Sequence, residues 1–218
     1  MKVGTDAVLL GAWADVSLTN NILDVGTGTG VIAIMLAQRC NAKIVAIEID
    51  NASYLQAIEN VAHCPWRDLI TLRKISFQEF QAESTLRFDL IICNPPYFIN
   101  SLKTGNHTRN LARHNDSLSH NDLIIGANKL LSDTGKLCTI MPNDEGSVFI
   151  AEAAGKGLFC ISKTNVRTIP HAPVKRILME FSKLPAPCHE NTINIGRGNH
   201  EEYPEKYKLL TKDFYLKF

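Results

Sequence analysis

The chain has little that would suit a membrane span, an export signal or bulk binding of nucleic acid. No apolar run approaches the roughly 18 residues that cross a bilayer, and the segment from Met1 to Asp6 lacks the pattern of a signal peptide. Lys and Arg together number 23 against 22 Asp and Glu, a net charge of +1. That balance excludes nucleic-acid binding by overall charge, but leaves room for a local basic patch. We expect a soluble, cytoplasmic protein without a membrane partner.

The sequence also lacks a cysteine pattern for disulfides or zinc. It has six cysteines and no Cys-x-x-Cys pair, and the closest two, Cys138 and Cys160, are 22 residues apart. Several lie within apolar runs such as Ile91–Cys93, where a thiol behaves as a small buried hydrophobe. We therefore expect reduced thiols and no bound metal.

What is present is the composition of one globular domain over residues 1–218. Hydrophobic residues make up 45% of the chain and charged residues 21%, which excludes disorder as the main state. Strand-like and helix-like segments alternate from residue 21 onward, and the strands are apolar on both faces, as in a parallel sheet covered by helices on both sides. The expected strands are Asn21–Val25, Lys43–Ile47, Asp68–Arg73, Phe88–Cys93, 136–141, 164–169 and 174–182. The expected helices are Val31–Ala37, Ala52–Ala62, 121–131 and 146–155.

This pattern predicts an α/β fold with a seven-stranded, mostly parallel sheet. The last two strands have no helix between them, so they should pair antiparallel across residues 171–173. A polar segment at 98–120 interrupts the alternation, and Pro185–Glu205 is the only stretch that resembles a tail.

A glycine-rich turn, Gly26-Thr27-Gly28-Thr29-Gly30, joins the first strand to the first helix after it. Glycines allow a tight turn and bring backbone N–H groups close to a ligand at the helix N-terminus. Glu48 lies 22 residues beyond Gly26, near where a nucleotide-binding unit places the acid that accepts hydrogen bonds from ribose. Asp50 is the rival for that role, and Glu48 is preferred because it lies nearer the strand end.

A second motif, Asn94-Pro95-Pro96-Tyr97, follows directly on the strand Phe88–Cys93. Ligands of open α/β sheets bind beyond the carboxyl ends of the strands, so this loop and the glycine turn should face the same crevice. The Asn94 side-chain oxygen and the Pro95 carbonyl can accept the two N–H bonds of an exocyclic amine, turning its lone pair toward a methyl donor. Tyr97 offers a ring on which a base can stack.

These motifs resemble those of class I S-adenosylmethionine (SAM)-dependent methyltransferases. More narrowly, the chain resembles bacterial tRNA (adenine-N6)-methyltransferases that modify adenosine 37 of a valine tRNA. The resemblance covers essentially the whole chain and is carried by five segments: Met1–Asp6, Leu9–Trp13, Leu23–Gly26, Arg87–Tyr97 and Asp213–Leu216. It implies a Rossmann-like fold, SAM as cofactor, tRNA as partner and catalysis by Asn94, Pro95, Pro96 and Tyr97.

The resemblance also implies which residues contact SAM. They are Thr5, Asp24, Gly26, Thr27, Gly28, Gly30, Glu48, Ser76 and Asn94. Thr5 and Asp6 would by this resemblance lie near the methionine end of SAM, and a helix N-cap at Thr5 or Asp6 is the alternative. Ser76 takes the position closing the third strand, where the family often has an acid facing the adenine of SAM. Members of the family also usually begin some tens of residues upstream of Met1, so part of an RNA-binding surface is expected to be absent.

For the RNA, the expected contacts are Tyr97, Lys103, Arg109 and Arg113 in the polar segment, and a second basic patch is formed by Lys163, Arg167, Lys175 and Arg176.

Three other functions stay open. An NAD-dependent oxidoreductase shares the glycine turn but has no use for the second motif. A protein-glutamine methyltransferase uses the same tetrapeptide on a planar amide. A non-catalytic RNA-binding module would not need Asn94. A monomer is favoured.

Overall fold

The computed structural model describes residues 4–95, 118–196 and 203–215. Eight strands form one sheet in the order β3-β2-β1-β4-β5-β7-β6-β8. Neighbouring strands pair in parallel except at β7, which runs antiparallel to both β5 and β6. The strands are β1 (Asn21–Val25), β2 (Lys43–Glu48), β3 (Ile70–Lys74), β4 (Phe88–Cys93), β5 (Leu131–Pro142), β6 (Phe159–Arg167), β7 (Val174–Ser182) and β8 (His189–Asn194).

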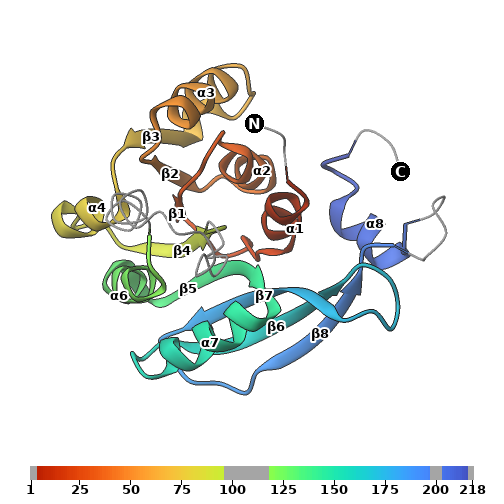
Figure 1. Ribbon diagram of the computed structural model, residues 1–218. Coiled ribbons are helices and arrows are strands. Elements are labelled where there is room, and N and C mark those ends of the chain that lie inside the picture. The colour runs from red at the N-terminus through yellow and green to blue at the C-terminus, as the bar shows by residue number, and fades with distance from the viewer. Residues whose placement is uncertain (1–3, 96–117, 197–202, 216–218) are drawn as a thin grey trace, which may run out of the picture.

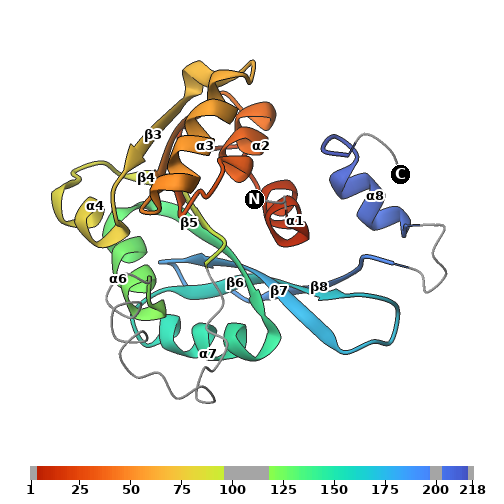
Figure 2. The same ribbon diagram turned by 45° about the horizontal axis from the view of Figure 1, so that its top comes forward.

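Helices cover both faces of the sheet (Figure 1). Those on one face are α1 (Thr5–Trp13), α2 (Val31–Arg39) and α3 (Asn51–Ala62), and those on the other are α4 (Phe77–Glu83), α6 (His120–Leu130) and α7 (Asn143–Ala154). Near the C-terminus, α8 (Glu205–Thr211) packs against α1, so that α1 lies between α2 and α8 (Figures 1 and 2). A single turn of 3-10 helix, Arg67–Leu69, precedes β3.

The strands are apolar on both faces because each face packs on helices. In β1, Ile22 joins the cluster beneath α1 and α2, while Leu23 joins the cluster beneath α6 and α7. In β4, Ile92 and Ile91 divide between the faces in the same way, and all four side chains are fully buried. Burying a side chain of this size contributes about 1.5–3 kcal/mol, so the central strands anchor the fold.

The predicted parallel sheet and antiparallel end are confirmed, but the sheet has one strand more than expected. The extra strand, β8, lies within the stretch expected to be a tail and pairs with β6 at the sheet edge. Its sequence, His-Glu-Asn-Thr-Ile-Asn, is mostly exposed and polar, so it carries no alternating apolar signal. The short helix α4 was also not anticipated.

Because β1, β2, β4 and β5 are parallel, their carboxyl ends lie at one edge of the sheet. That edge carries the glycine turn after β1, the acid at the end of β2 and the tetrapeptide after β4. Within the described residues, no helix is long and apolar enough to cross a bilayer, and no group of three side chains of the kinds that bind metals comes together.

Candidate cofactor and active site

The glycine turn after β1 adopts backbone conformations that favour glycine. Gly26 and Gly28 have φ angles of 68° and 59°, and a Cβ added at either position would meet no atom within 4 Å. Gly30, with φ of 84°, is the N-cap of α2. The turn is held by two backbone hydrogen bonds, from Thr27 N to Ile47 O at 2.9 Å and from Gly30 N to Thr27 O at 3.0 Å. The turn therefore presents bare backbone to the space in front of it.

Glu48 joins this turn to the end of β2. Its Oε2 accepts a hydrogen bond from Gly28 N at 2.8 Å, and its Oε1 accepts bonds from Ile49 N and Asp50 N, each at 2.8 Å. The side chain is only 9% exposed and lines the cavity described below. Charge-assisted bonds of this kind are roughly twice as strong as neutral ones, so Glu48 fixes the two loops relative to each other.

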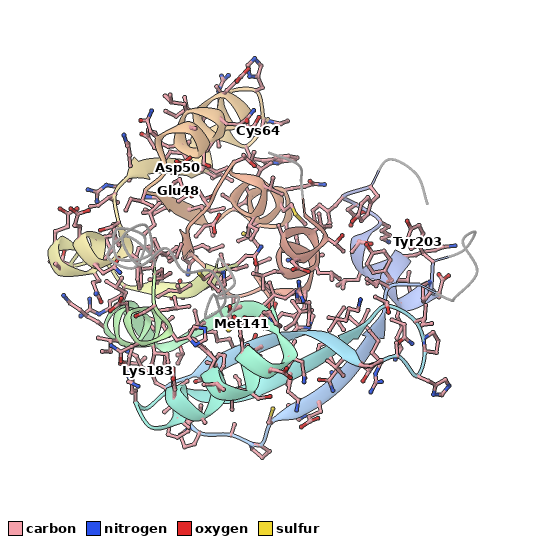
Figure 3. All side chains as sticks on the ribbon, in the orientation of Figure 1. Glu48, Asp50, Cys64, Met141, Lys183 and Tyr203 are labelled. Carbon is pink, nitrogen blue, oxygen red and sulfur yellow. The ribbon has the colours of Figure 1, made fainter. Side chains whose placement is uncertain are left out.

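Asp50, the alternative candidate for binding ribose, has a different role. Its Oδ2 accepts a hydrogen bond from Ser53 N at 2.8 Å and caps the N-terminus of α3. Hydrogen bonding to Ser53 holds the pKa of the Asp50 carboxyl below its usual value, and the residue does not line the cavity. Both acids lie at the junction of β2 and α3 (Figure 3), but only Glu48 lines the cavity.

Asp24, at the fourth position of β1, lies beneath the turn instead of in the cavity. It is fully buried, and its Oδ2 accepts a hydrogen bond from Thr27 Oγ1 at 2.6 Å, while its Oδ1 has no hydrogen-bond partner among the described atoms. Burial, with a smaller contribution from the charge of Glu48, raises the pKa of Asp24 to about 7. Asp24 therefore shapes the turn through Thr27, which does line the cavity.

A cavity of about 490 Å³ opens at this edge of the sheet. Its volume falls within the roughly 300–1,000 Å³ typical of small-molecule sites. It brings together most of the residues expected to bind SAM: Gly26, Thr27, Gly28, Glu48, Ser76 and Asn94. Pro95 also lines it and is buried, while Asn94 is half-buried at the end of β4. Gly30 and Asp24 support this wall from behind without lining the cavity.

Two expected contacts take different places. Thr5 is the first residue of α1 and lines a separate, smaller cavity, and its neighbours Gly4 and Ala7 line the large one. The N-cap of α1 is Gly4, without a side-chain hydrogen bond, so the alternative of a cap at Thr5 or Asp6 is wrong.

Ser76 lines the cavity but does not close a strand. β3 ends at Lys74, and Ser76 is the N-cap of α4. Its Oγ accepts a hydrogen bond from Glu79 N at 3.1 Å, and its backbone N donates one to Glu79 Oε2 at 3.1 Å, which together form a capping box. The Oγ also donates a hydrogen bond to Glu79 Oε2 at 2.7 Å. The hydroxyl is therefore occupied by the helix that it begins. The Ser-x-x-Glu spacing was the sequence signal that could have revealed α4.

The structure adds cavity residues that the motifs did not identify. They are mostly apolar and lie after β2, after β3, in the first turn of α4 and just before α6: Ile49, Ile75, Phe77, Gln78 and Leu118. Gln78 Nε2 also donates a hydrogen bond to Asp122 Oδ2 at 3.1 Å, which ties α4 to α6. Ile49 follows Glu48 directly, so its position beside the acid was the available signal. Five residues expected to act in catalysis or RNA binding lie outside the described residues: Pro96, Tyr97, Lys103, Arg109 and Arg113.

These features fit SAM. The glycine turn leaves room for close approach, a buried acid borders the same space, and apolar side chains offer a wall for a planar base. The orphaned Oδ1 of Asp24 adds an acceptor directly under the turn.

The comparisons with known proteins agree with this geometry. The family model "Methyltransferase small domain" matches residues 3–154. A tRNA1(Val) (adenine(37)-N6)-methyltransferase of Trichodesmium erythraeum is 48% identical over 221 residues, which cover 100% of this chain and 92% of the relative. Among solved structures, a predicted O-methyltransferase from Agrobacterium tumefaciens superposes with a TM-score of 0.73 at 20% identity, covering 95% of this chain and 96% of the other. A glycopeptide N-methyltransferase complexed with SAM gives 0.59 at 13%, covering 85% and 90%.

The fold and the cavity thus define a Rossmann-like, SAM-dependent methyltransferase. Within that class, the chain belongs to the tRNA1(Val) (adenine(37)-N6)-methyltransferase family.

Proposed function

We propose that the protein transfers a methyl group from SAM to the exocyclic N6 of adenosine 37 in a valine tRNA, acting in the cytoplasm as a monomer. The observation that carries this proposal is the meeting of Glu48, the glycine turn and Asn94-Pro95 around one cavity. The tRNA substrate is inferred from the family, because the relatives that match the chain over its full length are named for this reaction.

Within the cavity, the turn residues Gly26 and Gly28 approach the methionine part of SAM, and Glu48 accepts hydrogen bonds from the ribose hydroxyls. Ile49 and Ile75 offer apolar contacts to the adenine. When bound, SAM supplies an electrophilic methyl group on a sulfonium. The other part of catalysis is to orient the acceptor amine, and the residues that hold the amine do this.

Adenine N6 is a poor nucleophile because its lone pair is delocalised into the ring. The Asn94 side-chain oxygen and the Pro95 carbonyl accept its two N–H bonds, so the lone pair turns toward the methyl group. The same two acceptors stabilise the positive charge that develops on nitrogen. Methyl transfer is an in-line displacement in which the N–C bond would form as the S–C bond breaks, with S-adenosylhomocysteine as the leaving group. The amine proton would then pass to water, so alignment supplies much of the rate and no strong base is required.

These separate roles in cofactor binding and in amine binding are tested by changing Asn94 alone. Asn94→Ala removes one of the two acceptors, and we expect the rate of methyl transfer to fall by about 100-fold or more. SAM affinity, measured by calorimetry, should change only a few-fold, because the turn and Glu48 remain. Asn94→Ala with full turnover would contradict the proposed role. Loss of SAM binding with unchanged folding would assign Asn94 to the cofactor instead.

A further inference from the structure

A second, smaller cavity lies on the other side of α1 from the cofactor cavity. It has a volume of about 140 Å³ and is formed by α1, the end of β6, the start of β7 and the residue after β8. Gly4 and Ala7 of α1 face the large cavity, whereas Thr5, Asp6 and Leu9 face the small one. Since a helix with its side chains is about 10–12 Å across, roughly that distance separates the two cavities.

The strand topology places this cavity at the active edge of the sheet. β7 runs antiparallel to β5, and Arg176 near its start pairs with Pro142 at the carboxyl end of β5. β6 runs antiparallel to β7, so Arg167 at its end pairs with Val174 at the same edge. The cavity is therefore beside the place where the acceptor base must enter.

The lining of the small cavity is cationic, although the chain as a whole has a net charge of only +1. Among the described residues that line it, three are cations, Arg167, Lys175 and Arg176, and one is a carboxylate, Asp6. Thr5 and Thr168 add hydroxyl groups to the same wall. Cations beside hydroxyls are the usual protein ligands of nucleic-acid phosphates.

Two of the cations are fixed in place by the protein itself. Arg167 Nη1 donates a hydrogen bond to Ala172 O in the turn between β6 and β7. Arg176 Nε donates to Asp6 Oδ2 at 2.9 Å and its Nη1 donates to Lys175 O at 3.0 Å. Lys175 also lines the cavity and is exposed. Guanidinium groups already held in position lose less conformational entropy when they bind a phosphate.

We propose that this cavity binds a phosphodiester group of the tRNA backbone next to the target adenosine. The inference rests on the function proposed above and adds to it the surface that holds the substrate. An enzyme that modifies a base turns that base out of its stack. A phosphate held about one helix diameter away would fix the neighbouring backbone and thereby the position of the base.

The test uses Lys175→Glu, since Lys175 is exposed and none of the described hydrogen bonds or ion pairs depends on its ammonium group. Lys43→Glu is the matched control: Lys43 is also exposed, but it begins β2 at the opposite edge of the sheet. Affinity for unmodified tRNA is measured over a range of salt concentrations. We expect Lys175→Glu to raise the Kd several-fold and to reduce the slope of log K against log salt by about 1. Lys175→Arg and Lys43→Glu should behave like the unaltered chain.

Three further readouts separate the possible failures. SAM affinity and thermal stability of Lys175→Glu should equal those of the unaltered chain, and the KM for tRNA should rise while kcat changes little. Equal tRNA affinity and salt slope in Lys175→Glu and Lys43→Glu would overturn the assignment and leave the proposed reaction intact. An unaltered chain that binds SAM but methylates no tRNA would overturn the proposed function, and this surface with it.

A free anion is distinguished by adding inorganic phosphate at constant ionic strength. We expect it to shift the melting temperature of the unaltered chain and of Lys175→Glu equally. A stabilisation by phosphate that is lost in Lys175→Glu, with tRNA affinity unchanged, would assign the cavity to a small anion and overturn the proposal.

Discussion

At the scale of single residues, the cofactor site depends on two acids with opposite environments. Glu48 is surrounded by three backbone N–H groups that satisfy its carboxylate. Asp24 is fully buried, and one of its oxygens has no hydrogen-bond partner among the described atoms. The carboxylate of Glu48 is positioned by these bonds and can also accept hydrogen bonds from ligand hydroxyls. The burial of Asp24 raises its pKa, so the two acids lead to different predictions.

Replacing Glu48 with Gln should weaken SAM binding by about tenfold or more. The amide nitrogen cannot accept a hydrogen bond from a backbone N–H, so at least one buried donor loses its partner, which costs about 1–3 kcal/mol. Asp50→Asn is the control, because Asp50 caps α3 and does not line the cavity. Calorimetry should find its SAM affinity within about twofold of the unaltered chain. The reverse ranking would show that Asp50 holds the ribose.

Asp24 should make the folded state less stable as the pH rises. Its pKa is raised from an ordinary value of 3.8 to about 7 in the folded chain, so between these values the folded state binds more protons than the unfolded state. Stability contributed by this group is therefore present at low pH and lost as the pH rises toward 7, by at most about 1.4 kcal/mol per pH unit.

Denaturant unfolding between pH 5 and pH 8 measures this effect. Asp24→Asn cannot ionise at this position, so between pH 5 and pH 7 its stability should fall less steeply with pH than that of the unaltered chain, and the gap between the two curves should stop growing above about pH 7. Parallel curves for the two chains would show that Asp24 does not titrate in this range.

At the scale of elements, the loops after the strands are fixed by local caps as much as by the core. Asp50 caps α3, Ser76 caps α4 and Ser119 caps α6, each by accepting a backbone N–H bond. Each cap fixes the direction in which the chain leaves the carboxyl edge of the sheet. The walls of the cofactor cavity are therefore set partly by the first turns of these helices.

The capping box of α4 gives a prediction about Ser76. Ser76→Ala and Glu79→Ala each remove one half of the box, and each should lower the free energy of unfolding by about 0.5–2 kcal/mol. Because the Ser76 hydroxyl is bonded to Glu79, SAM affinity should change by no more than about threefold in either variant. Urea unfolding and calorimetry provide the two readouts. A large loss of SAM affinity in Ser76→Ala alone would show that the hydroxyl contacts the cofactor.

At the scale of the whole molecule, the sequence predicted the sheet well where the core imposes the pattern. The strands β1, β2 and β4 are buried on both faces, so their apolar runs marked them almost to the residue. β8 is exposed and polar, so nothing in its composition distinguishes it from a loop. The first residues of β5, Leu131–Gly135, include Ser132 and Asp133, which hid that strand's true beginning.

The residues of the candidate site likewise include some that the sequence predicted and some that depend on how the helices pack. Spacing along the chain identified Glu48, the glycine turn and Asn94, because those residues lie at the ends of strands that meet at one edge. The resemblance predicted a cofactor contact at Thr5, which lines the smaller cavity, whereas Gly4 and Ala7 line the large one. A difference of one residue on a helix rotates a side chain by about 100°. Which side of α1 faces the cofactor depends on packing against β5 and α2, and that information is absent from a local motif.

The methylated atom is identified most directly by labelling the product. The protein is incubated with labelled SAM and tRNA from cells that lack this gene, and the RNA is then digested and its nucleosides are identified. We expect label in N6-methyladenosine, and almost none with Asn94→Ala. Label in another nucleoside, or transfer to protein glutamine in place of tRNA, would contradict this expectation.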